Sequence, residues 1–314
     1  MDVEKQTADR TDALLRLLSA EGIGHAIARR LINGLGSPEA VLGASSARIA
    51  SSCGLRHEAA TLVARAIEHS DPTHEQQQLD ALQGRFLLWS EPGYPEPLCR
   101  IPDPPPVLRI VGGSLAQQEL AVAIVGTRRC TTYGRRQAAR FASVLASAGI
   151  TIVSGGARGI DGEAHRAALR CGGKTIVVLG SGLGCLYPAE HEPLFKDVVT
   201  AGGTLVSEFP VNQPPRPGQF PRRNRIVAGL CIGVLVVEAP CRSGAMITAR
   251  LAVEEQGRDA WAVPGSVDHR TSAGCHAAIA QGWAALVDSP EALLQFMHDG
   301  GWFRSSGRSP VAPA

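Results

Sequence analysis

The chain of 314 residues has no long hydrophobic run. A membrane-spanning helix needs about 20 consecutive apolar residues, and no stretch approaches that length. The N-terminus is polar and lacks the apolar segment of a signal peptide. We therefore expect no membrane partner and a cytoplasmic location.

Paired cysteines are missing as well. The eight cysteines stand singly and form no C-x-x-C motif. Disulfide frameworks and structural zinc sites use such close pairs, so this spacing argues against both and is typical of a reducing compartment. We expect no metal site.

The chain also has little excess charge and few aromatic residues. Its 31 basic and 29 acidic residues give a net charge of +2, and aromatic residues make up 4%. Any basic surface must therefore be local. Glycine is abundant instead: the 35 glycines gather from Gly112 onward and indicate tight turns or close approach of the backbone to a ligand.

The first 75 residues are predicted to form a small all-helical domain, because leucines recur at helical spacing and glycines end each run. Residues 22–32 also resemble a helix-hairpin-helix element, in which a glycine-rich turn presents backbone N–H groups to a phosphate. That pattern is common in helical bundles, so we favour packing over DNA contact. Polar residues 71–78 mark the boundary to a second domain over 76–295.

In the second domain, short apolar runs alternate with amphipathic segments. The predicted strands are 121–125, 150–153, 175–179, 204–206, 233–237 and 259–263. This alternation predicts a mostly parallel sheet covered on both faces, an α/β fold of the doubly wound, Rossmann-like type. Residues 296–314, which end in a stretch rich in Ser, Gly and Pro, are expected to form a disordered tail.

Glycines, arginines and acids follow these predicted strands. Ligands of open parallel sheets bind outside the carboxyl ends of the strands, where glycines admit an anion to the backbone and arginines bind phosphate. The residues in these positions are Gly126, Arg128, Ser154, Gly155, Gly156, Arg158, Asp161, Ser207, Glu208, Glu238, Ser243, Gly244 and Thr248. Together they predict a site for a phosphate-bearing ligand.

Two nucleotide-binding fingerprints are absent. The stretch from Gly180 to Gly184 lacks the spacing of a dinucleotide-binding loop, Pro188 interrupts the helix that it would open, and no P-loop occurs. We expect no cofactor. Asp161 and His165 could form a catalytic dyad, but a hydrogen bond that locks the loop is favoured. Glu208 and Glu238 could be catalytic acids or acceptors of backbone N–H bonds, and the sequence does not decide between these roles.

The segment Phe220-Pro-Arg222-Arg223-Asn224-Arg225 precedes an apolar helix predicted over 226–230. Arginines beside an aromatic residue suit a single-strand binder, since cations neutralise phosphates and a ring stacks on a base. The alternatives are a solvated basic turn or an interaction with Glu208 at the start of a helix.

Several motifs occur in order along most of the chain. They are Ile124-Val-Gly-Thr-Arg128, Ser154-Gly-Gly-Ala-Arg-Gly-Ile-Asp161 with His165, Tyr187-Pro188, Ser207-Glu208, Phe220 to Arg225, Val236-Val-Glu238 with Ser243-Gly244 and Thr248, and Pro264-Gly265. With these motifs the chain resembles the DNA-processing protein A family (DprA/Smf).

The resemblance implies a sterile-alpha-motif-like helical domain before an extended Rossmann-like domain. It implies a homodimer, without enzymatic activity, that binds single-stranded DNA, protects it during natural transformation and loads the RecA recombinase. Carried over by position, the DNA-binding residues are Gly126, Arg128, Gly155, Gly156, Arg158, Phe220, Arg222, Arg223, Asn224, Arg225, Ser243 and Gly244. The pocket-shaping residues are Ser154, Asp161, His165, Ser207, Glu208, Glu238 and Thr248.

The chain departs from the family pattern in places. Ala189-Glu190 stands where many relatives carry a basic residue, and Gly274-Cys-His276 replaces a Gly-x-Asn motif. We do not expect the winged-helix domain with which many relatives end.

Three functions are weighed: a single-stranded DNA-binding mediator, a nucleotide-processing enzyme of the phosphoribohydrolase type, and a structural adaptor. The mediator is favoured. The enzyme type relies on an acid three residues past a threonine, where this chain has Leu251 after Thr248. The adaptor leaves the arginine-lined loops unexplained.

Overall fold

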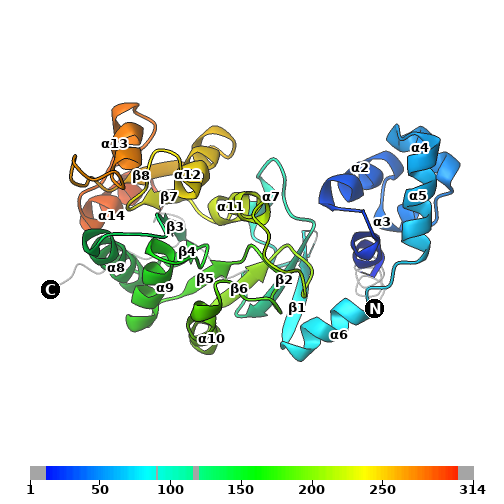
Figure 1. The fold of residues 1–314 in the computed structure, drawn as a ribbon, viewed down its shortest axis with the longest axis horizontal. Helices are drawn as coiled ribbons and strands as arrows, with labels where there is room; N and C mark the ends of the chain where they lie inside the picture. The colour runs from blue at the N-terminus through cyan, green and yellow to red at the C-terminus, as the bar shows by residue number, and fades with distance from the viewer. Residues whose placement is uncertain (1–11, 90, 116–119, 303–314) are drawn as a thin grey trace. The chain divides into compact units, whose positions relative to one another are not determined.

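The protein is described from a computed structural model, which covers residues 12–89, 91–115 and 120–302 (Figure 1). It forms two compact units, a helical unit that extends to Ala81 and an α/β unit that holds most of the chain beyond it. The predicted boundary at residue 75 falls inside helix α6 (Thr73–Ala81). None of the described helices is long and apolar enough to span a membrane.

The helical unit is a bundle of short helices that share one apolar core. Residues 12–19 are helical, and the following helices are α2 (His25–Leu35), α3 (Pro38–Leu42), α4 (Ser46–Cys53), α5 (His57–Glu68) and α6. Ser37 and Ser45 cap α3 and α4, as their side chains accept hydrogen bonds from backbone N–H groups of the first turn. Within the helix-hairpin-helix candidate, Ala28 and Leu31 are buried, so this face of α2 packs in the core.

The α/β unit is built on the sheet, whose order is β1-β2-β6-β5-β4-β3-β7-β8-β9. The strands are β1 (Gly84–Leu88), β2 (Val107–Gly112), β3 (Ala121–Val125), β4 (Thr151–Ser154), β5 (Thr175–Val178), β6 (Thr204–Ser207), β7 (Gly233–Val236), β8 (Asp259–Ala262) and β9 (Ala285–Leu286). Neighbouring strands pair in parallel along the part of the sheet ordered β6-β5-β4-β3-β7-β8-β9, and β2 pairs antiparallel with β6. This mostly parallel, Rossmann-like sheet preceded by a helical region confirms the predicted fold class.

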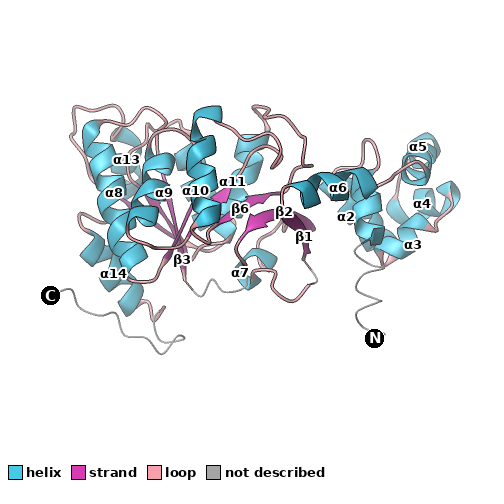
Figure 2. Ribbon diagram, turned by 90° about the horizontal axis from the view of Figure 1, so that it is seen from below, coloured by secondary structure: helices cyan, strands magenta, loops and turns pink. Residues whose placement is uncertain are grey.

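Helices cover both faces of the sheet (Figure 2). Ala121, Ala123 and Val125 of β3 belong to one apolar core, and Val122 and Ile124 belong to the other, as alternation along a strand requires. The first core is completed by α7 (Glu96–Cys99), α11 (Gln219–Gly229), α12 (Gly244–Glu254) and α13 (Ala273–Ala280). The second is completed by α8 (Thr132–Ser147), α9 (Ile160–Arg170) and α14 (Pro290–Asp299).

The order of the strands reverses at β3, which pairs with β4 on one side and with β7 on the other. In doubly wound folds, the crevice outside the carboxyl ends of such strands binds ligands. The loops that follow β3, β4 and β7 therefore meet at one place, as the sequence predicted.

Two predicted boundaries are wrong. Helix α14 extends to Asp299, with Met297 buried, and Trp302 packs against the same core, so residues 296–302 are not a tail; residues 303–314 lie outside the described part of the chain. Helix α11 begins at Gln219, whereas the sequence predicted a helix only from residue 226. The basic segment is consequently helical, and its side chains point in several directions around α11.

Candidate functional site

A cavity of about 730 Å³ lies at the carboxyl ends of β3 and β4, bounded by the N-terminal turns of α11 and α12. The predicted site residues that line it are Gly126, Arg128, Gly155, Asp161, Phe220, Arg223, Asn224, Ser243, Gly244 and Thr248. Arg158 lines a narrow adjoining cavity. Segments far apart in the sequence thus converge on one site.

The loop after β3 forms one wall of this cavity. Its backbone is held by a hydrogen bond of 2.7 Å from Thr127 N to Glu238 O. A Cβ atom at Gly126 would lie 2.8 Å from Cβ of Ile160 and 2.9 Å from the carbonyl oxygen of Glu238, so only glycine fits. The exposed Arg128 side chain follows, and no described carboxylate pairs with it. Arg128 is therefore a cation available to a ligand.

Aromatic rings lie beside this arginine. The Arg128 guanidinium is 5.3 Å from the centroid of the Phe220 ring, and the rings of Phe220 and Tyr187 are 5.6 Å apart. A Cβ atom at Gly180 would lie 2.7 Å from Phe220 Cδ1, so the glycine leaves room for the ring. Tyr187 also lines the cavity. Tyr187 was not among the site residues predicted from the sequence, although its place after the glycine-rich loop that follows β5 was a usable signal.

The loop after β4 is held in shape by buried charges. The Asp161 carboxylate accepts hydrogen bonds from Gly155 N at 3.2 Å and from Ala157 N at 3.4 Å. The buried Arg223 donates to Gly155 O at 2.7 Å and to Val178 O. Burial raises the pKa of Asp161 and lowers that of Arg223 to about 10, while the attraction between the two groups opposes both shifts. Arg223 lines the cavity, but its guanidinium is engaged by the backbone.

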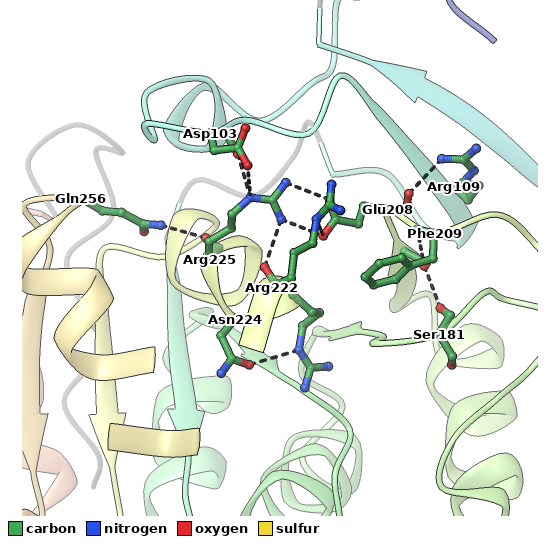
Figure 3. Close-up of polar contacts among 11 residues, drawn as sticks. Asp103, Arg109, Ser181, Glu208, Phe209, Arg222, Asn224, Arg225 and Gln256 are labelled. Atoms are coloured by element: carbon green, nitrogen blue, oxygen red, sulfur yellow. Dashed lines mark hydrogen bonds and ion pairs between the residues drawn. The ribbon is translucent and has the colours of Figure 1, made fainter. Parts of the chain in front are cut away.

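Arg225, the arginine that ends the basic segment, is paired with other residues inside the protein (Figure 3). Arg225 Nη1 and Nη2 donate to Glu208 Oε1 and Oε2 at 2.7 and 2.8 Å, and Arg225 Nε donates to Asp103 O at 2.8 Å. Its side chain is 10% exposed and that of Glu208 0%. Burial, the largest single influence, lowers the pKa of Arg225, but the hydrogen bonds to Glu208 together with the charges of Glu208 and Asp103 raise it by more, and the net pKa is raised.

This geometry corrects the prediction that Arg225 contacts DNA, because its donors are used inside the protein. The alternative noted from the sequence, an interaction with Glu208 at the start of a helix, describes Arg225. It also applies to Arg222, whose Nε lies 3.4 Å from Glu208 Oε1. Arg222 remains exposed and lies outside the main cavity.

Glu238 has a structural role as well. Its carboxylate accepts hydrogen bonds from Thr131 N at 2.8 Å, Thr131 Oγ1 at 2.9 Å and Thr271 Oγ1 at 2.7 Å. Thr131 is the N-cap of α8, so the acid ties this helix to the loop before α13. Of the two roles left open from the sequence, hydrogen-bond acceptance fits the geometry of both acids: Glu238 accepts from the backbone N–H of Thr131, and Glu208 accepts from the Arg225 side chain.

Asp161 and His165 have different hydrogen-bond partners. His165 Nδ1 is 2.7 Å from Thr175 Oγ1, and burial lowers the pKa of this histidine to about 3. The expected hydrogen bond that locks the loop is made by Asp161 alone. Buried serines hold neighbouring strands: Ser154 Oγ donates to Ile124 O at 2.6 Å, and Ser207 Oγ donates to Ser181 O at 2.7 Å. Ser154, Ser207, His165 and the buried Gly156 do not line the cavity.

Helix α12 directs its N-terminus toward the cavity, since Ser243 and Gly244 line it. The Ser243 side chain caps the helix by accepting from Met246 N at 3.4 Å, and Thr248 Oγ1 donates to Gly244 O at 3.0 Å. The partial positive charge of a helix N-terminus favours an anion there. The altered segment that includes Gly274 is part of the scaffold, because Gly274 N donates to Ala239 O at 2.9 Å.

The site therefore combines an open cation, aromatic rings and a helix N-terminus around one cavity. No group of three or more potential metal-ligating side chains occurs among the described residues. The fold and the site define an α/β protein of the doubly wound type, with a cavity lined by an exposed arginine and a helix N-terminus at the reversal of strand order.

Comparison with known proteins identifies the family. The model of the family described as DNA recombination-mediator protein A matches residues 85–298, and the chain belongs to this family. Protein Smf of Escherichia coli is 47% identical over 207 residues, which make up 66% of this chain and 55% of that protein. DNA processing protein DprA of Streptococcus pneumoniae is 41% identical over 203 residues, 65% of this chain and 71% of that protein.

Solved structures agree with this assignment. The X-ray structure of DprA from Streptococcus pneumoniae superposes with a TM-score of 0.76 at 33% identity, covering 89% of this chain and 95% of that one. DNA processing protein A from Helicobacter pylori, whose structural study concerns its unique single-stranded DNA binding mode, gives a TM-score of 0.63 at 30% identity, covering 69% and 97%. The chain spans about half the length of the first curated relatives, at 55% and 53%.

Proposed function

We propose that the chain binds single-stranded DNA in the cavity at the carboxyl ends of β3 and β4. The observation that carries this proposal is the exposed Arg128, which lies beside the Phe220 ring and has no described carboxylate partner. A phosphate of the strand binds the guanidinium and the nearby N-terminus of α12, while a base stacks on the ring. The binding mode named for the Helicobacter pylori relative supports the choice of ligand.

Family membership supports the rest of the proposed role. We infer that the protein is a cytoplasmic recombination mediator that protects incoming DNA and loads RecA during natural transformation, and that it acts as a homodimer. We also infer that it is a binding protein and not an enzyme. The use of Glu208 and Glu238 as buried acceptors and the presence of Leu251 in place of an acid support this inference.

The test measures binding of a labelled single-stranded oligonucleotide by fluorescence anisotropy over a series of salt concentrations. Arg128→Gln is expected to weaken binding roughly tenfold, the value of one charged hydrogen bond. Because one phosphate contact is lost, the log–log salt slope should become shallower by about 0.7. The loss should be similar for all base sequences, because the arginine binds the backbone of the strand.

The matched control is Arg140→Gln on α8. Arg140 is also an exposed arginine, and its Nη2 lies 3.4 Å from Glu291 Oε2, but it does not line the cavity. This variant should bind as the wild type does. Equal losses in both variants would refute the proposed site. Release of free base from a nucleoside monophosphate, detected by chromatography, would favour the nucleotide-processing alternative.

A further inference from the structure

The rim of the cavity holds a second arginine that is already paired. Arg158 donates from Nε and Nη2 to the two carboxylate oxygens of Glu190, and the Nη2–Oε2 distance is 2.9 Å. Its guanidinium also lies 5.9 Å from the centroid of the Tyr187 ring. The Arg158 and Glu190 side chains are 48% and 50% exposed. Unlike the buried pair of Arg225 and Glu208, this pair is open to solvent and to a ligand.

The pair stands at the narrow cavity that adjoins the main one. Arg128, Arg158, Tyr187 and Phe220 line this narrow cavity. These two exposed arginines therefore flank a space whose other walls are the two aromatic rings, Pro188, the buried Arg223 and the backbone of the loop after β4. The narrow cavity measures only about 10 Å³, so a phosphate would contact the two guanidinium groups from its rim, with the neighbouring bases against the rings.

Glu190 is held in its position by the fold. It belongs to the 3₁₀ turn η1 (Ala189–His191). The next residue, His191, is buried and its Nδ1 lies 2.9 Å from Gly156 O, which ties the turn to the loop that carries Arg158. A carboxylate that binds an arginine through both oxygens uses the same donors as a phosphate would. Glu190 therefore occupies the phosphate-binding edge of Arg158.

We propose that Arg128 and Arg158 form a subsite for a further phosphate of the DNA strand, and that Glu190 is a built-in counter-charge which this phosphate displaces. The inference rests on the proposed binding of single-stranded DNA. Displacement is feasible because an exposed ion pair is weak and screened by salt. Glu190 thus lowers the affinity for the strand, because the phosphate can bind Arg158 only after the Glu190 carboxylate has been displaced into solvent.

The experiment is a cycle of variants measured with the same labelled oligonucleotide at low and moderate salt. Glu190→Gln keeps the shape of the side chain and removes its charge, so binding should tighten about twofold to fivefold at low salt. Arg158→Gln should weaken binding and make the salt slope shallower by about 0.7. In the Arg158→Gln background, Glu190→Gln should have little effect, because the cation for which it competes is gone.

The matched control is Glu192→Gln, the same charge change two residues along the chain. Glu192 Oε1 pairs with Lys196 Nζ at 2.8 Å on α10 (Glu192–Thr200). Tightening by this variant equal to that of Glu190→Gln would overturn the inference, since it would show a general effect of charge. An equal effect of Glu190→Gln with and without Arg158 would also overturn it.

The proposed function and this inference fail in different ways. If Arg128→Gln weakens binding and neither Glu190→Gln nor Arg158→Gln changes it, the subsite is refuted and the proposed function stands. If the wild-type protein does not bind the oligonucleotide, both are refuted.

Discussion

Replacing Arg225 by methionine should destabilise the α/β unit. The substitution removes the bidentate partner of Glu208, whose side chain is fully buried; the contact of its carboxylate with Arg222 Nε is longer, at 3.4 Å. Removing one member of a buried ion pair costs about 3–5 kcal/mol, because the remaining charge is desolvated without compensation. For a unit of this size, the loss corresponds to a fall in Tm of roughly 10 °C.

The measurement is urea unfolding followed by tryptophan fluorescence, which reports on Trp261, buried in β8. The double variant Arg225→Met/Glu208→Leu should recover most of the loss, since a buried pair replaced by apolar residues is often neutral in free energy. Arg222 is half-exposed and can turn to solvent when Glu208 is removed. The control Arg140→Met breaks an exposed pair and should cost less than about 1 kcal/mol.

Two results would refute this reasoning. One is a loss below about 1 kcal/mol for Arg225→Met, the level of an exposed pair. The other is a double variant no more stable than the single one. At a temperature where the variant is folded, Arg225→Met should also weaken DNA binding less than Arg128→Gln does, because the donors of Arg225 are used within the protein.

Two further predictions concern packing and pH. Gly126→Ala should cost about 1–3 kcal/mol of stability and weaken DNA binding, because its Cβ meets Ile160 and the carbonyl of Glu238; Gly218→Ala, which meets nothing within 4 Å, should be neutral in thermal unfolding. His165 has a folded-state pKa of about 3, below the unfolded value of about 6.5. As the pH falls, the unfolded state therefore binds the proton first. The free energy of unfolding should decrease between about pH 6.5 and about pH 3, at up to about 1.4 kcal/mol per pH unit. Urea titrations of wild type and His165→Asn should show a flatter pH dependence in the variant, and equal slopes would contradict the assignment.

The parallel sheet and the place of the site follow from local patterns in the sequence. Apolar runs that alternate with amphipathic helices specify strands buried on both faces. Since the carboxyl ends of parallel strands share one edge, residues such as Gly126 and Gly155, directly after their strands, had to lie near one another. That inference needed no knowledge of long-range contacts.

The boundaries of α11 and α14 were harder to predict. Arginine and asparagine around residues 222–225 suggested a loop, yet the helix begins at Gln219, and Arg223, Asn224 and Arg225 are buried within it. In α14, the buried Met297 and the packing of Trp302 extend ordered structure past the predicted end of the domain. In both cases tertiary packing outweighs local composition.

The sequence by itself determined that arginines gather around one edge of a parallel sheet, and only the tertiary structure decided which of them are available to a ligand. Arg128, Arg223 and Arg225 look alike in sequence, but one is exposed, one is bound by backbone carbonyls and one is paired with Glu208. The partners of the last two lie far away in the sequence, at or just after the ends of other strands, in Val178 and Gly155 for Arg223 and in Glu208 for Arg225. The physical reason is that burial makes an unpaired charge too costly to keep, and the burial of a side chain is a property of the assembled fold.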